Sequence, residues 1–481
     1  MKHIYSKAAL ILILMAGVLT ACKKSFLEIV PKGELVAQTT SDYDGLLNSS
    51  NLLTFSANAQ IQMGDEVAAV DPYFTAAVLK TQAGFRWEAV LYQPSDDAGE
   101  TVLPLKNIYL YNKIINEVPH ATDGTDQQKL SIAAEAMAGR AWTYFLLINY
   151  YGKPYNAKTA ATDPGFPIIK NADVTTTNFS RATVQQVYDF IIQDLTTAIP
   201  NLPSQISYRT RMSKAAAEGL LGKVYTFMGR YNDALTQLNT SIADLANQPI
   251  PVRLYDYNVE FDDGGVFTPD DVDFGPSYPL LPNNYENVYG RSTSDSWTFI
   301  YNELVLNPQA AALFGPTDLR LKFYTNTTAF TQTPYPVAGV LRHWGYSQAQ
   351  FGVVLPDLYL LKAECECRGN DLTDAVSDVQ TLRAKRMPAA DAVVPAATAS
   401  QQLPLLKFIL NERIREFAVQ GYRWFDMRRL SVDPLFQGVT YTHTLYSATG
   451  SATTFQLSPD RFTLQIPPKL MNQNPNMVNN P

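Results

Sequence analysis

The sequence contains little histidine and cysteine, which limits the metal and redox chemistry that it can support. Its 481 residues include four histidines and three cysteines. His120, His343 and His443 lie far apart in the chain and lack the spacing of metal ligands. The motifs G-x-S-x-G and H-E-x-x-H are absent, as are a P-loop and a dinucleotide fingerprint. The sequence therefore predicts no metal, no cofactor and no catalytic centre of these kinds.

A disulfide framework is also not expected. Cys365 and Cys367 fall in a stretch with helical periodicity, where residues two apart point to different faces and cannot easily bridge each other. A Cys-x-Cys metal site would need further ligands, and no histidine lies nearby. The fold must therefore be held together by core burial, for which a mature chain of about 440 residues is long enough.

Basic clusters are missing as well. The formal net charge is −7, and no block of lysines and arginines occurs. Nucleic acid and anionic lipid surfaces are poor partners for such a chain. The 45 acidic residues could supply a carboxylate pair for glycoside hydrolysis, but no motif singles out a pair.

The N-terminus reads as an export signal with a lipid attachment site. A basic start precedes a short apolar run over 8–19, which is shorter than the roughly 20 residues of a membrane span. Residues 19–22 read LTAC, and this order resembles a bacterial lipobox. We expect residues 1–21 to be a signal peptide, Cys22 to carry the lipid, and 22–35 to form a tether. Lys23 follows where an aspartate would favour the inner membrane, so the outer membrane is expected.

The mature chain is expected to be mainly α-helical. Apolar residues recur every three or four positions over 130–152 and 181–203. Two further segments, 213–245 and 355–386, each have the pattern of a tetratricopeptide-like helix pair, with small residues where the helices cross. Because these pairs are far apart in the chain, the sequence predicts a helical scaffold with long irregular insertions packed on one side. Thr183 and Ser213 are candidate helix caps, and Gly229 and Gly369 mark the turns of the two pairs.

Residues 251–355 have a different composition, rich in Tyr, Pro, Asp, Asn, Gly and Ser. Loops of this length are usually functional or disordered, and the many aromatics argue against disorder. We therefore expect an ordered loop region that serves recognition. Whether calcium helps to organise its Asp-rich part, 262–273, stays open.

A charged cluster occupies residues 410–430. Acidic and basic side chains alternate with apolar ones at helical spacing, so both signs lie within pairing distance. An ion-pair network between packed helices is the favoured interpretation, and an anion or ligand site is the alternative. The charged members are Glu412, Arg413, Arg415, Glu416, Arg423, Asp426, Arg428 and Arg429.

Taken in order, several segments make the chain resemble the SusD/RagB family of outer-membrane lipoproteins from the Bacteroidetes. They are the lipobox, "FLEIVPKGEL", "FRWEAVLYQPSDDAG", "LKNIYLYNKIINEV", "AEAMAGRAWTYFLLINYYGKPY", "LFGPTDLRLKFY", "LPDLYLLKAECECRGN", "NERIREFAVQGYRWFDMRRL" and "IPPKLMNQNPNMVNNP". Two features depart from that family's pattern: its tryptophan is replaced around Leu103 to Leu105, and a glutamate is replaced by Gln420.

The resemblance implies a fold and a role. The fold is a superhelix of tetratricopeptide-like helix pairs, with an N-terminal region over 36–280 and a C-terminal region over 281–481 forming one compact unit. The role is non-enzymatic: such proteins capture a nutrient, usually an oligosaccharide and sometimes a peptide, and deliver it to a SusC-like TonB-dependent transporter. The helical side is associated with the transporter and the loop side with the ligand.

Two groups of residues combine aromatic rings with polar side chains, as a sugar site requires. The main candidates for ligand binding are Asp65, Tyr73, Trp87, Tyr285, Tyr289, Arg291 and Trp297. The first group is Asp65, Asp71, Tyr73, Trp87, Tyr92 and Asp96, and the second group is Tyr285, Asn287, Tyr289, Arg291, Trp297 and Tyr301. Each aromatic has core packing as its alternative, which is favoured for Trp142 and Trp424 because they sit within strong helices. For Trp344, core packing and ligand binding both stay open.

Three functions remain to be distinguished. The leading one is a surface glycan- or nutrient-binding lipoprotein; a peptide ligand would use the same groups as a glycan. The second is a carboxylate-dependent glycoside hydrolase, and the third is a scaffold that binds only proteins through its helical repeats.

Overall fold

The computed structural model describes residues 37–54, 58–176, 178–294, 302–345 and 348–481. The signal peptide, Cys22 and the tether lie outside these ranges, as do Trp297 and Tyr301. Within them the chain is mainly α-helical, as the sequence predicts. The longer helices are α7 (Gly99–Glu117), α8 (Asp126–Tyr151), α9 (Val184–Ala198), α10 (Lys214–Phe227), α11 (Tyr231–Asp244), α15 (Leu355–Arg368), α16 (Leu372–Arg383), α18 (Gln402–Phe417) and α19 (Tyr422–Ser431). The shorter ones are α2 (Thr40–Leu46), α3 (Ser50–Leu53), α4 (Ala59–Gln62), α5 (Tyr73–Ala76), α6 (Leu79–Phe85), α12 (Tyr257–Glu260), α14 (Pro308–Ala311), α17 (Ala396–Ala399) and α20 (Pro468–Gln473).

Local signals set the ends of these helices. Thr125 begins α8 with a capping box, in which its hydroxyl accepts a hydrogen bond from the backbone N–H of Gln128. Thr183 and Ser213 cap α9 and α10, as predicted. Such caps satisfy backbone donors that have no partner within the helix, so they fix where each helix starts.

Both predicted helix pairs are present: α10 packs on α11, and α15 packs on α16. Gly222 lets the first pair approach closely, because a Cβ there would lie 2.7 Å from Leu238 Cγ. Gly229 turns the chain with a φ of 72°, whereas at the second turn Asn370 rather than Gly369 takes the positive φ, at 65°.

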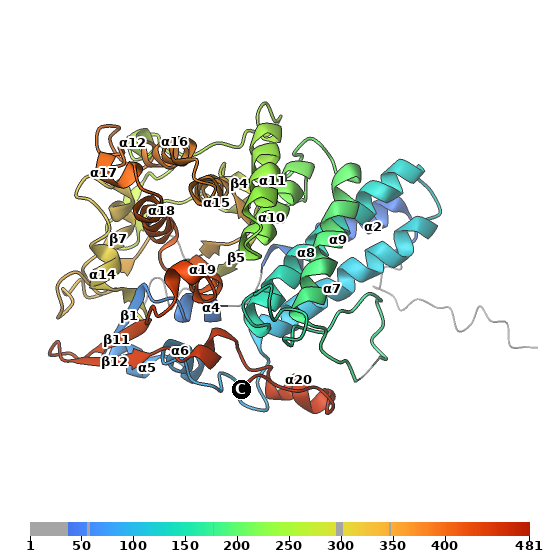
Figure 1. Ribbon diagram of the computed structural model, residues 1–481, viewed down its shortest axis with the longest axis horizontal. Coiled ribbons are helices and arrows are strands. Elements are labelled where there is room, and N and C mark those ends of the chain that lie inside the picture. The colour runs from blue at the N-terminus through green and yellow to red at the C-terminus, as the bar shows by residue number, and fades with distance from the viewer. Residues whose placement is uncertain (1–36, 55–57, 177, 295–301, 346–347) are drawn as a thin grey trace, which may run out of the picture.

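Although the pairs are far apart in the chain, α11 contacts α15, so they stack directly on each other. Figure 1 shows α7, α8 and α9 at one end of the molecule, α10 and α11 in the middle, and α15, α16 and α18 at the other end. The chain between the two pairs, from the end of α11 to the start of α15, therefore leaves this row of helices and returns to it.

A small mixed sheet joins the two ends of the chain. Its order is β12 (Ala452–Gln456), β11 (Thr442–Tyr446), β1 (Val67–Val70) and β6 (Val305–Leu306). The central strand β1 is fully buried; it pairs parallel with β11, Ala69 facing Leu445, and antiparallel with β6, Val67 facing Leu306. The remaining strands form two-stranded pieces: β2 (Asp270–Asp271) with β3 (Gly275–Pro276), β4 (Asn287–Tyr289) with β10 (Val353–Val354), β5 (Ser292–Ser294) with β9 (Gln348–Gln350), and β7 (Tyr324–Thr325) with β8 (Arg342–His343).

The main hydrophobic core runs through the helices. Trp142 and Trp424 belong to it and are 4% and 0% exposed, which confirms their assignment to the core. Cys365 and Cys367 are buried free thiols, as expected from their spacing on a helix. Within the described ranges, no helix combines the length and the apolar character that crossing a membrane requires.

The described part of the loop region is built around an aromatic cluster of its own. Tyr255, Tyr257, Phe267 and Phe323 are buried together there. Their rings meet mostly edge to face or tilted, with the centroids of Tyr257 and Phe267 4.8 Å apart. Such contacts stabilise a segment with little regular secondary structure, so the expectation of an ordered loop region holds for its described residues.

Candidate functional site

The structure buries Trp87, which the sequence predicted to bind ligand. The indole is 3% exposed, its ring stacks on His443 with centroids 3.8 Å apart, and its Nε1 donates to the carbonyl of Met63 at 3.0 Å. Tyr92 is also buried, and its hydroxyl bonds to Glu100. These rings present no face to solvent, so the expectation that they form an exposed platform is wrong.

The other members of the first group reach the surface in part, but they have local roles. Asp65 receives two hydrogen bonds from Arg423, at 2.5 and 3.1 Å, which tie the N-terminal segment to α19. Asp71 accepts hydrogen bonds from Thr75 at the start of α5. Tyr73 is half-buried against the apolar cluster behind β1. The first group is therefore dispersed and does not converge on one cavity.

The second group is mostly buried as well. Tyr289 and Arg291 are 1% and 3% exposed, and the guanidinium of Arg291 lies 3.7 Å from the centre of the Tyr289 ring. The Tyr289 hydroxyl also contacts that of Tyr111 at 3.3 Å. Asn287 is fully buried on β4. These side chains connect the loop region to the helices, which corrects the expectation that they face a ligand.

Tyr285 alone of the described residues in this second group is half-buried. The guanidinium carbons of Arg209 and Arg253 lie 5.0 and 4.8 Å from the centre of its ring. Tyr285 thus stays a candidate for ligand contact, together with Asp65 and Tyr73.

An ion-pair network holds the loop region against the helices, and its centre is a pair of acids on α18. Glu412 and Glu416 are four residues apart and so lie on one face of the helix. Arg320 bonds to both, at 2.7 and 2.9 Å. Arg383 adds a bond to Glu412, and Arg386 one to Glu416 at 2.6 Å. This confirms the ion-pair interpretation of the charged cluster.

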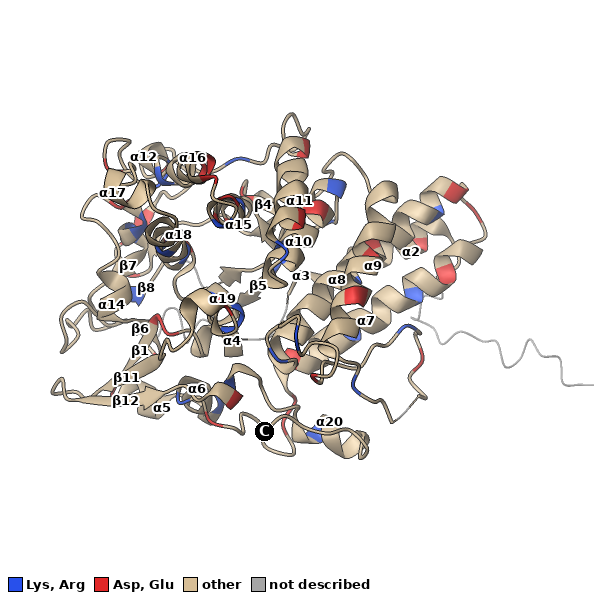
Figure 2. Cartoon of the chain, viewed as in Figure 1, with Lys and Arg blue, Asp and Glu red and all other residues tan. Residues whose placement is uncertain are grey.

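The network continues onto α19 and α15, where Figure 2 marks further charged positions on the ribbon. Arg413 bonds to Asp357 and Asp426, both at 2.7 Å, and Arg429 bonds to Glu364 at 2.6 Å. Arg428 differs from its neighbours, because its guanidinium donates to the backbone carbonyl of Gly152, at 2.6 Å. Burial lowers the pKa of Arg428 to about 9.

Arginines around Glu412 and Glu416 favour the ionised form of these two buried carboxyl groups. Burial alone would raise the pKa of Glu412, but Arg320, Arg415 and Arg383 outweigh it and hold that pKa well below its usual range. The pKa of Glu416 is lowered in the same way, with Arg386 and Arg320 opposing the effect of burial.

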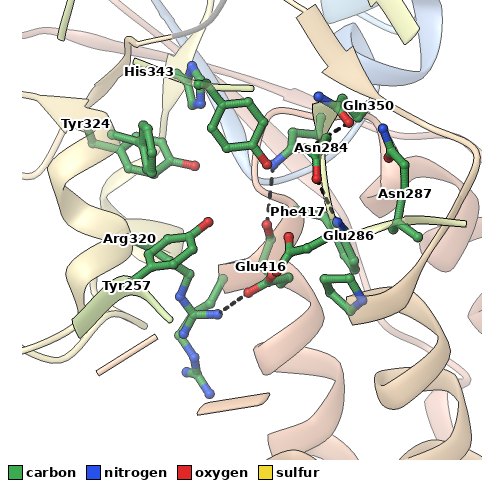
Figure 3. Close-up of a pocket in the computed structure, with 16 residues that line it drawn as sticks. Tyr257, Asn284, Glu286, Asn287, Arg320, Tyr324, His343, Gln350, Glu416 and Phe417 are labelled. Atoms are coloured by element: carbon green, nitrogen blue, oxygen red, sulfur yellow. Dashed lines mark hydrogen bonds and ion pairs between the residues drawn. The ribbon is translucent and has the colours of Figure 1, made fainter. Parts of the chain in front are cut away.

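These charges enclose a small polar cavity (Figure 3). Its volume is about 40 Å³, and its wall includes Tyr257, Glu286, Gln350, Glu416 and Gln420. A space of this size holds one or two water molecules and cannot admit a sugar. Both carboxylates in the wall are bound by Arg386, at 2.7 and 2.6 Å. They therefore act as structural anchors.

Gln420 also lines this cavity. Its Nε2 donates to the backbone carbonyl of Glu416 at 3.3 Å. Glu286 and Glu416 supply the carboxylates in this wall, and the Gln420 side chain adds a neutral amide to it.

Two larger cavities open to the surface. The first, of about 580 Å³, lies in the loop region between α14, β7 and the turn at Gly339. The second, of about 610 Å³, lies between α7, residues 166–179 and α20, and most of its lining is apolar. Figure 1 places α7 and α20 away from α14 and β7, so the two cavities belong to different faces of the molecule.

None of the described residues that line the first cavity is among the ligand-binding residues predicted from the sequence. Tyr324 ends the segment "LFGPTDLRLKFY" and lines this cavity, and the remaining lining residues are largely small or aliphatic. Such residues carry no chemical signature. An aromatic residue followed by Thr325 and Asn326 was the one available hint.

Comparison with known proteins decides the family. Residues 36–226 match a family model described as "Starch-binding associating with outer membrane". Residues 346–481 match the model of the SusD family. The chain belongs to the SusD/RagB family.

Several members of the SusD/RagB family resemble this chain at low identity. A SusD-like protein P38 of Formosa agariphila is 23% identical over 353 residues, which cover 61% of this chain and 65% of that protein. The match thus spans less than two thirds of that relative.

Among solved structures, a putative sugar-binding protein from Bacteroides vulgatus has a TM-score of 0.70 at 19% identity, covering 93% of this chain and 99% of that one. A laminarin-binding SusD-like protein has a TM-score of 0.63 at 17% identity, with 92% and 100% covered. These likenesses establish the fold.

We expect the replacement Glu416→Gln to reduce the free energy of unfolding by about 3–5 kcal/mol, because Arg320 and Arg386 would lose a buried charge partner. Urea denaturation followed by circular dichroism measures this. Glu88→Gln is the matched control, since the Arg86–Glu88 pair is exposed and 3.4 Å long, and it should change stability by less than about 0.5 kcal/mol. Equal effects of the two replacements would contradict a structural role for the network.

A second prediction concerns pH. Glu66 is 2% exposed, and burial raises its pKa to about 8 from an ordinary value of 4.5. Between these values the folded chain keeps a proton that the unfolded chain has released. The free energy of unfolding should therefore fall as pH rises through this window, by up to about 1.4 kcal/mol per pH unit.

Glu66→Gln should remove this contribution, so its stability relative to the wild type should rise between about pH 5 and about pH 8.5. Urea denaturation at both values tests this. Parallel stability curves for the two proteins would show that Glu66 titrates normally.

Proposed function

We propose that this protein is a cell-surface lipoprotein that captures oligosaccharide and delivers it to a SusC-like TonB-dependent transporter in the outer membrane. The observation that carries the proposal is the family match over 36–226, whose description names starch binding and association with the outer membrane. A neighbour of the same fold, named for laminarin binding, supports a glycan as the ligand.

The surroundings of the buried acids Glu286 and Glu416 support binding without cleavage. Hydrolysis of a glycosidic bond needs two carboxyl groups on either side of the bond, with room for the sugar. Glu286 and Glu416 share a wall but face a cavity of about 40 Å³, and Arg386 holds both. We therefore propose a binding protein and keep the carboxylate-dependent hydrolase as the less favoured alternative.

Anchoring is assigned to Cys22, which lies outside the described residues. Two or more acyl chains on one protein give stable membrane attachment, because each buried methylene contributes about 0.8 kcal/mol. A chain anchored in this way needs no helix across the membrane.

The transporter is proposed to dock on the helical side. The apolar cavity beside α7 supports this, because apolar recesses on a surface mark protein interaction sites. Val174 is 81% exposed at its rim and Tyr109 is 40% exposed, so both would be covered by a partner.

Purified protein should bind at least one polysaccharide from a panel that includes laminarin and soluble starch, and should leave it intact. Affinity electrophoresis measures binding, and chromatography of the incubated glycan detects products. Release of shorter glycans would favour the hydrolase, and binding of peptides alone would favour the peptide ligand.

A pull-down from native membranes tests delivery. Pro481 is exposed, so a C-terminal tag is accessible, and the wild type should recover a large barrel protein. Cys22→Ala should leave the protein without lipid and reduce recovery, because the anchor holds both proteins in one membrane.

Val174→Asp should also reduce recovery of the barrel. Its matched control is Val393→Asp, since Val393 is 58% exposed and lies after α16, away from the apolar cavity. If lipidated wild type recovers no barrel, the delivery role is wrong.

A further inference from the structure

The open groove in the loop region has the size of a ligand site. Its volume of about 580 Å³ falls within the range of roughly 300–1,000 Å³ that is usual for small-molecule sites. One wall comes from Pro308, Ala311 and Ala312 of α14 and its C-cap, and the floor includes Tyr324 and Leu341.

The groove carries no charge. Among the described residues that line it, none is acidic or basic. The charged residues next to it in the chain are engaged elsewhere. Arg320 is 4% exposed and bonded to Asp318, Glu412 and Glu416, and Lys322 Nζ lies 4.4 Å from the centre of the Phe261 ring. Arg342 is 0% exposed, and its Nε donates to the carbonyl of Thr327 at 3.1 Å. An ionised ligand would lose its hydration here without gaining an opposite charge, which is costly.

The aromatic floor is held rigidly. The Tyr324 hydroxyl donates to the carbonyl of Ala418 at 3.2 Å, and its ring meets His343 edge to face with centroids 5.3 Å apart. Phe314 packs on it at 5.8 Å. Tyr324 as a whole is half-buried and lines the groove. A fixed ring loses little conformational freedom when a ligand lies on it, which favours binding.

Hydrogen-bonding groups stand at the side of this floor. Asn326 is exposed, and its amide offers both donors and acceptors. Thr325 adds a hydroxyl, which contacts that of Thr327 at 2.9 Å. Gly339 is exposed with a φ of 82° and has no side chain to shield its backbone. Flat apolar surface beside such groups matches a sugar ring, which has an apolar face and hydroxyls at its edge.

We propose that this groove binds an uncharged glycan, with a sugar ring on Tyr324 and its hydroxyls on Asn326 and Thr325. The assignment rests on the proposed function and adds to it the place of binding and the class of glycan. Polysaccharides built from uronic acids are excluded by the absence of a cationic partner in the groove.

The test compares neutral and acidic polysaccharides. Laminarin and soluble starch are the neutral probes, and alginate and polygalacturonate are the acidic ones. Wild-type protein should bind at least one neutral probe in affinity electrophoresis and in calorimetry, and should bind the acidic probes at least about tenfold more weakly.

Ala312→Trp fills the groove from an exposed position and should weaken binding of the neutral probe at least tenfold. Ala397→Trp is the matched control, because Ala397 is also exposed on a short helix, and it should bind like the wild type. Asn326→Ala should weaken binding about fivefold, the effect of one lost hydrogen bond. Circular dichroism verifies that each variant is folded.

The outcomes separate the two proposals. Unchanged binding of neutral glycan by folded Ala312→Trp overturns the groove as the site and leaves glycan capture standing. Preference for an acidic probe overturns the neutral class. Failure of the wild type to bind any of the four polysaccharides overturns glycan capture itself, and the groove assignment with it.

Discussion

Glu412 and Glu416 on α18 bind arginines that come from two other parts of the chain. Arg320 precedes β7, Arg383 and Arg386 end the α16 segment, and the loop that carries Glu286 is reached through Arg386. Removing one partner from such a set would leave a buried charge unpaired, which would strongly destabilise the fold. The loop region, with its own aromatic cluster, is therefore fixed to the helices at a charged junction in addition to the apolar contacts of residues such as Val288 and Phe351 with the main core.

That junction also positions the proposed binding surface. Tyr324 belongs to the wall of the small charged cavity and to the floor of the open groove. Its ring is supported by His343 and Phe314. The buried ions thus lie directly behind a neutral surface. Arginine and glutamate provide rigidity there, while the residues that face solvent are small, aliphatic or amide-bearing.

The sequence predicted the helices well because their signals are local. Thr183 and Ser213 cap helices through neighbours three residues away, and the spacing of small residues defines each helix pair. The ion-pair network was also predictable, since both signs of charge recur along 410–430. Its partners outside this segment were not, because Arg320 and Glu412 are brought together only by tertiary folding.

The candidate ligand residues were harder to assign for the same reason. An aromatic residue within a polar segment gives the same sequence pattern whether its ring faces solvent or the core. Trp87 is covered by His443, which lies 356 positions later in the chain, at a centroid distance of 3.8 Å. The groove could not be predicted because its shape comes from the small residues Ala312 and Gly339. Small residues that line a cavity leave no recognisable pattern in the sequence.

The central strand β1 has a consequence for how the chain reaches this structure. Both of its neighbours, β6 and β11, are synthesised more than 230 residues after it. Until they arrive, residues 67–70 have two open edges, and unpaired edges of apolar strands are prone to associate with other chains. High contact order of this kind slows folding. A protein with such a sheet depends on protection of its N-terminal third until the last hundred residues have been synthesised.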